Sequence, residues 1–130
     1  MDRPGNAGSH LRTAWHKVYG RSLDPSGAYR EAVRAVEAAA KPVITPNDSL
    51  ATWGKMIKAL RDKPQKWVAE LGSISVVADM MGELWTSQLD RHGTDDESVP
   101  LSVSSAQAEA AVHLATTLVH WFKGGMVDRA

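Results

Sequence analysis

Cysteine is absent from the sequence. This absence excludes a disulfide framework and a thiolate nucleophile, and it is compatible with a reducing compartment. A zinc site built on cysteine and histidine is excluded for the same reason. A Gly-rich phosphate loop is also missing, because Gly124-Gly125 does not stand between a strand and a helix. We therefore expect no metal and no cofactor.

Net charge and long apolar runs are missing too. The 15 basic and 15 acidic side chains cancel, so net charge gives no support for broad attraction to nucleic acid or membranes, although a local patch remains open. No uninterrupted apolar run is long enough to span a bilayer. The first nine residues, MDRPGNAGS, lack the apolar middle of a signal peptide. We expect a soluble, cytoplasmic protein with no membrane partner.

The chain does have apolar content with a helical period. Hydrophobic residues make up 43% of the 130 residues, which is enough for one core and one domain. Residues 1–8 are rich in Gly, Pro and Asn, so we expect a flexible N-terminal tail there. A single helical domain is expected over residues 9–124, followed by a C-terminal tail over 125–130. No strand-like alternation competes with this interpretation, apart from short runs such as 74–77.

Two helices are expected in the first third of the chain. Ser9 is a suitable N-cap for a short helix that ends at Gly20. Asp24 is a suitable N-cap for the next helix, and Pro25 suits the first helical position, where its missing N–H costs nothing. Pro42 should end or kink this second helix near its end. Its apolar face consists of Tyr29, Val33, Val36, Ala40 and Val43.

The strongest helical pattern lies in the middle of the chain. After a third helix that stops before Pro64, apolar residues recur at alternating spacings of four and three. Gly72-Ser73 could break this pattern into a short helix and a long one, and both readings stay open. We expect the long helix to end within about four residues of Asp90. The apolar faces of the third helix and of the following pattern are Leu50, Trp53, Ile57 and Leu60, and then Trp67, Leu71, Ile74, Ala78, Met81 and Trp85.

A last helix is expected after a loop over residues 91–103. Ser104 or Ser105 caps it, and Gly124-Gly125 ends it. The sequence as a whole predicts an all-α fold, an antiparallel bundle of four to five helices with short loops. The inward face of the last helix is expected to be Ala108, Ala111, Val112, Ala115, Leu118, Val119 and Phe122.

Two groups of polar residues on these helices have competing interpretations. His113 and His120 share one face of the last helix. In a functional interpretation they are metal ligands or a proton relay. Metal-binding pairs on helices are usually four residues apart, so packing at the edge of the apolar face is favoured. Glu37 has Arg34 three residues before it and Lys41 four residues after it. This spacing favours a surface cluster of ion pairs, each contributing about 0.5 kcal/mol, over a catalytic carboxylate.

Asp90, Arg91, His92 and Gly93 follow the strongest helical pattern directly. In a functional interpretation these four residues form a binding turn, with Arg91 and His92 as candidate catalytic residues. In a structural interpretation they only close a helix, since cations at a helix C-terminus are favoured by about 0.3–1 kcal/mol and glycine often follows the last turn. We expect a turn that serves both recognition and helix closing.

Three segments of the chain resemble one known family. They are AYREAVRAVEAAAKPVITPND at 28–48, LWTSQLDRHG at 84–93 and SSAQAEAAVHLATTLVHWF at 104–122. Over roughly residues 11–123 the chain looks like the abortive-infection C-terminal domains of the HEPN superfamily. The resemblance implies a helical bundle that often pairs into homodimers. In active members it implies metal-independent RNA cleavage, with a role in phage defence or toxin–antitoxin systems.

The catalytic signature of that family is only partly present. It consists of an arginine and a polar residue, then a histidine after a gap of four to six residues; the arginine stabilises phosphorane charge and the histidine moves a proton. His92-Gly93 match its end, but residues 86–88 read Thr-Ser-Gln where the arginine is expected. Arg91 adjoins His92 instead. Arg3 and His10 have the right separation, but we discount them as part of the N-terminal tail.

Three functions remain open from the sequence. The first is a dimeric HEPN-like domain that binds RNA or a partner protein, with its catalytic signature degenerate. The second is a metal-independent endoribonuclease that uses Arg91 and His92. The third is a structural adaptor whose apolar helix face takes a partner protein. We favour the first.

Overall fold

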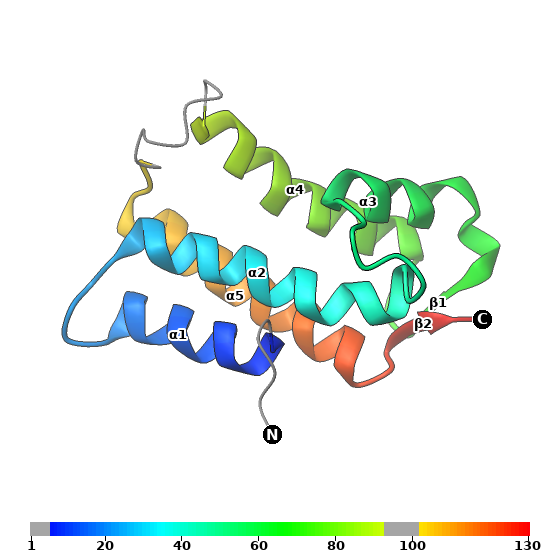
Figure 1. Ribbon diagram of the computed structural model, residues 1–130, viewed down its shortest axis with the longest axis horizontal. Helices are drawn as coiled ribbons and strands as arrows, with labels where there is room; N and C mark the ends of the chain where they lie inside the picture. The colour runs from blue at the N-terminus through cyan, green and yellow to red at the C-terminus, as the bar shows by residue number, and fades with distance from the viewer. Residues whose placement is uncertain (1–5, 93–101) are drawn as a thin grey trace.

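The computed structural model describes residues 6–92 and 102–130, and within them the fold is helical (Figure 1). The predicted all-α bundle is confirmed, since only a two-stranded sheet accompanies the helices. The helices are α1 (Ala7–Tyr19), α2 (Pro25–Ile44), α3 (Trp53–Asp62), α4 (Ile74–His92) and α5 (Ser105–Lys123). A 3₁₀ turn (Pro64–Lys66) leads into β1 (Trp67–Ala69), and β2 (Val127–Arg129) follows α5.

Two predicted N-caps are present. The Asp24 carboxylate accepts a hydrogen bond from the backbone N–H of Gly27, and Pro25 occupies the first position of α2. That backbone donor, and then the Lys17 ammonium, lower the pKa of Asp24 below its ordinary value. Ser104 caps α5 through a reciprocal pair of hydrogen bonds with Gln107, the arrangement called a capping box.

The first helix begins earlier than the sequence predicts. The side chain of Asn6, and not that of Ser9, is the cap: it accepts a hydrogen bond from the Ser9 N–H. Asn6 is a good N-cap because its short amide reaches the free N–H groups of the first turn. Residues 7 and 8, which the sequence assigns to the tail, therefore belong to α1, and His10 lies inside this helix.

The second helix is the centre of the core. In Figure 1, α1 and α5 both lie along α2, while α4 slants away from it toward its C-terminal end. Six of the ten buried residues of α2 are glycine or alanine, so the neighbouring helices approach it closely. Pro42 lies inside the last turn, and α2 ends two residues later. The most deeply buried of its small residues are Ala28, Ala32, Ala35, Val36 and Ala40.

The apolar faces expected for the third helix and for the following helical pattern are each wrong at one place. Residues 67–69 form strand β1, and a turn with Gly72 at a φ of 75° separates it from α4, so Leu71 is 70% exposed. Pro64 opens a 3₁₀ turn that redirects the chain into this extended segment. Leu50 is 87% exposed because α3 begins later, after the N-cap Thr52.

The expected C-terminal tail instead contains strand β2, which pairs antiparallel with β1. Its Arg129 lies opposite Trp67 in the register. The Arg129 guanidinium donates hydrogen bonds to the carbonyls of Val43 (3.2 Å) and Ile44 (2.9 Å) at the end of α2. It also stands 4.9 Å from the centroid of the Trp67 ring. One side chain thus satisfies free carbonyls of α2 and joins β2 to β1.

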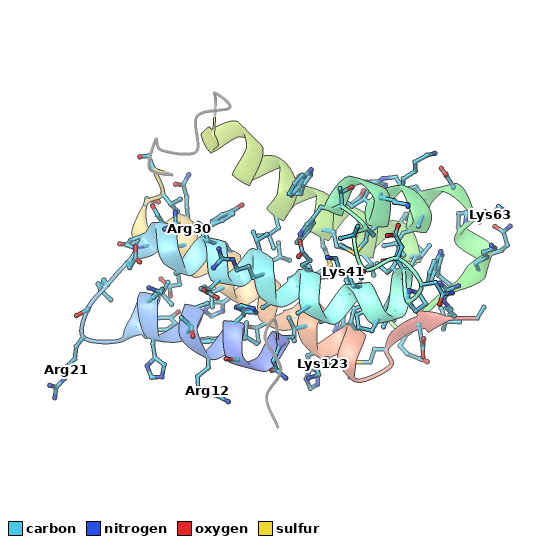
Figure 2. All side chains as sticks on the ribbon, viewed as in Figure 1. Arg12, Arg21, Arg30, Lys41, Lys63 and Lys123 are labelled. Atoms are coloured by element: carbon cyan, nitrogen blue, oxygen red, sulfur yellow. The ribbon has the colours of Figure 1, made fainter. Side chains whose placement is uncertain are left out.

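Replacing Arg129 with Ala should lower the free energy of unfolding by about 1–2 kcal/mol, because it removes charge-assisted hydrogen bonds and a cation–π contact. Urea denaturation measures this loss. Arg21→Ala is the matched control, since it removes the same charge from the loop before α2, where Figure 2 shows Arg21 at the edge of the molecule. Equal stability of the two variants would contradict the capping role.

Candidate functional site

The predicted turn begins on the last turn of α4. This helix ends at His92, so the prediction that it ends near Asp90 is confirmed. The side chains of Asp90, Arg91 and His92, and Gly93 as a whole, lie outside what the structure describes. Positions 91 and 92 are consecutive helical positions, which lie about 100° apart around the axis. The backbone therefore does not bring these two positions to one point.

A groove opens beside α4, lined by residues of α2, α4 and α5. Figure 1 shows that α4 diverges from α5 toward its C-terminal end. The volume of the groove is about 280 Å³. The hydroxyl of Tyr29 donates a hydrogen bond to the carbonyl of Leu84 (2.8 Å) across its floor. Nearby, Trp85 is only partly buried and stacks on Trp53, with ring centroids 5.8 Å apart. The groove is lined by Tyr29, Glu83, Leu84, Gln107, Ala110, Ala111 and Leu114.

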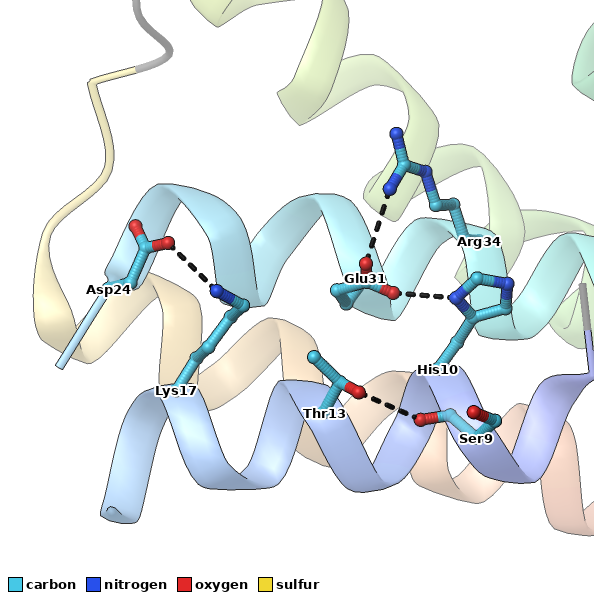
Figure 3. A network of polar contacts seen from close by, with 7 residues as sticks. All are labelled: Ser9, His10, Thr13, Lys17, Asp24, Glu31 and Arg34. Carbon is cyan, nitrogen blue, oxygen red and sulfur yellow. Dashed lines mark hydrogen bonds and ion pairs between the residues drawn. The ribbon is translucent and has the colours of Figure 1, made fainter. Parts of the chain in front are cut away.

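A second hollow lies between α1 and α2, and most of the residues that line it are ionisable. Its volume is about 420 Å³, and it is lined by His10, Arg34, Glu37, Ala38 and Lys41. Glu31 stands beside it and holds two of these residues, as Figure 3 shows. The Glu31 carboxylate accepts hydrogen bonds from Nδ1 of His10 (2.6 Å) and from the guanidinium of Arg34 (3.2 Å). Glu31 and His10 are mostly buried, with 16% and 23% of their side chains exposed.

The cluster around Glu37 differs in one pair from the sequence prediction. Lys41 pairs with Glu37 as expected (3.5 Å), and it also donates to the carbonyl of Ser49. Arg34 pairs instead with Glu31, three residues before it. The sequence does not predict His10 as a site residue, because its spacing from Arg3 begins in the segment expected to be a tail. The helix expected after Ser9 already contains His10, but no local pattern indicates that Glu31, 21 residues away, is its partner.

His113 packs against α1, as the favoured interpretation of the sequence predicts. Its Nε2 lies 2.8 Å from the hydroxyl of Tyr19, and its ring lies 5.1 Å from that of Trp15. The Tyr19 hydroxyl also donates to the Glu109 carboxylate (2.5 Å). This hydrogen bond, with desolvation and the negative charge of Glu109, raises the pKa of Tyr19. His120 is exposed.

In the Glu109→Gln variant the pKa of Tyr19 should move back down toward its ordinary value, because the carboxylate that accepts the phenol proton and repels the phenolate is gone. Ultraviolet absorbance during an alkaline titration follows this change. The chain has two tyrosines, so the Tyr29→Phe variant shows which part of the absorbance change belongs to Tyr19. Glu83→Gln, a carboxylate on α4, serves as the control. A Tyr19 titration identical in wild type and Glu109→Gln would show that the carboxylate does not act on this phenol.

Comparison with known proteins adds no assignment to these features. The chain matches no protein-family model, and no curated protein or solved structure is significantly similar to it. In residues 6–92 and 102–130, no helix is long and apolar enough to cross a membrane. Within the same ranges, no three histidine or acidic side chains are grouped to hold a metal ion.

Proposed function

We propose that this chain is a HEPN-like helical domain that pairs with a second copy of itself and acts in phage defence or toxin–antitoxin-type regulation. It does so by binding RNA or a partner protein. The observation that carries the proposal is the apolar groove between α4 and α5. Leu84, in this groove, precedes Asp90 by less than two helical turns, so a partner seated there also reaches the end of α4.

The composition of the groove suits self-association. Ala110 and Leu114 supply apolar surface above the buried Leu84, and Glu83 and Gln107 supply polar groups. A two-fold pairing brings the same patch of both copies together, so each apolar lining covers the other. Such surfaces are typical of interaction sites when a single copy leaves them uncovered. The HEPN resemblance supports the same arrangement, because it implies homodimers.

Light scattering after gel filtration should report a dimer for the wild type and a monomer for Ala110→Glu. Ala110 is exposed and lines the groove, so the new carboxylate blocks pairing without entering the core. Ser105→Glu is the matched control: it adds the same side chain to α5, about 140° around the helix from Ala110, and should leave the dimer intact. A wild type that stays monomeric at high concentration would contradict pairing and favour the adaptor function.

Catalysis at Arg91 and His92 is the alternative, and we expect at most weak activity there. Metal-free RNA cleavage needs a proton-moving group and a cation that converge on one phosphate. Consecutive positions on α4 diverge, and only a pairing that brings Arg91 of one copy to His92 of the other gives the convergence that catalysis requires. The assay is RNA cleavage in EDTA by wild type, Arg91→Ala and His92→Ala. Robust cleavage that both substitutions abolish would establish the ribonuclease instead.

A further inference from the structure

We propose that the hollow between α1 and α2 binds the phosphate group of a nucleotide, either free or within an RNA strand. It is a different surface from the groove between α4 and α5, and its residues come from different helix faces. The proposal is independent of pairing, and it names a ligand class that the proposed function leaves open.

His10 is held in one orientation at the edge of the hollow. Its Nδ1 is held by the partly buried Glu31 carboxylate at 2.6 Å, so the ring is fixed with Nε2 as the remaining polar atom. Among the described residues, no protein group hydrogen-bonds to Nε2. A carboxylate that fixes one ring nitrogen in this way makes the other available to a ligand. His10 lines the hollow, so a ligand seated there has this nitrogen within reach.

Arg34 and Lys41 supply further hydrogen-bond donors to the hollow. Arg34 uses one of its five N–H groups on Glu31, and Lys41 uses two of its three on Glu37 and Ser49. Both residues therefore keep donors for a ligand. A phosphate group offers several acceptor oxygens in a tetrahedral arrangement, which suits donors that arrive from α1 and from two turns of α2. The small side chain of Ala38 between them leaves the space open.

Charge favours an anion over a cation at this place. Glu31 and Glu37 each already have a basic partner, so neither carboxylate is left without a counter-charge. Arg34 and Lys41 balance these two carboxylates. A phosphate oxygen accepts a hydrogen bond from Nε2 only when His10 is an imidazolium, so binding a phosphate here also places the one positive charge of that imidazolium beside the anion. The hollow also has about 420 Å³, within the range of roughly 300–1,000 Å³ typical of small-molecule sites. This volume suits a phosphate attached to a nucleoside better than a bare ion.

The test is a titration of the full chain with three probes: inorganic phosphate, adenosine monophosphate and a short single-stranded RNA. Calorimetry gives the affinity, and NMR follows the imidazole proton signals, with His10 assigned from a His10→Gln variant. We expect adenosine monophosphate or RNA to bind and the His10 signals to move, while those of the exposed His120 on α5 stay in place. Binding of RNA alone would identify the backbone of a strand as the source of the phosphate.

Variants separate this site from general attraction to a basic surface. Arg34→Gln and Lys41→Gln should each weaken binding about tenfold, the effect of losing one charge-assisted hydrogen bond. Arg12→Gln is the matched control and should bind as the wild type does. Position 12 lies about 200° around α1 from position 10, and Figure 2 shows Arg12 on the side of α1 away from α2.

Two results would overturn the proposal: no binding of any probe at millimolar concentration, or an affinity that Arg34→Gln and Arg12→Gln change equally. Circular dichroism of each variant confirms that it is folded. Failure of this site is distinguishable from failure of pairing, because Arg34 and Lys41 do not line the groove of the proposed dimer.

Discussion

The close packing of α2 is the constraint on which the rest of the structure depends. Ala28, Ala32, Ala35, Ala39 and Ala40 are buried along this helix and carry almost no side-chain volume. Small side chains lose no rotamer entropy on burial and allow helix backbones to approach each other. α1 and α5 therefore both pack along α2, and α3 adds a further contact, so one helix organises most of the core.

This packing also decides where α2 can carry chemistry. Most charged residues of α2 lie on the strip that its neighbours leave uncovered, and Glu31 lies beside this strip, mostly buried against His10 of α1. Arg30, Arg34, Glu37 and Lys41 fall within about 60° of one another around the axis, and this strip forms one wall of the hollow beside His10. Tyr29 lies at another edge of α2, where it reaches α4 and forms part of the groove. Both candidate surfaces are thus built on one rigid element.

Most local interactions are predictable from the sequence, the Asn6 cap of α1 being an exception, and the long-range ones are not. Asp24 and Ser104 cap helices through residues three positions away, so their roles follow from short spacings alone. Trp67 takes an extended conformation that pairs with Arg129, a partner more than sixty residues away, and no periodicity reveals such a contact. His10 was discounted on the composition of the preceding segment, and its partner Glu31 lies on another helix. Pairing and ligand binding involve further molecules, so those expectations remain predictions.

Amide hydrogen exchange tests the central place of α2 most directly. The amides of residues 32–40 should exchange only through global unfolding, so that their exchange free energy equals the free energy of unfolding from urea denaturation. The alanine-rich face cannot open without releasing α1 and α5 together, which is the physical reason for this equality. Exchange of these amides through local opening, several kcal/mol below global unfolding and faster than in α5, would contradict the account.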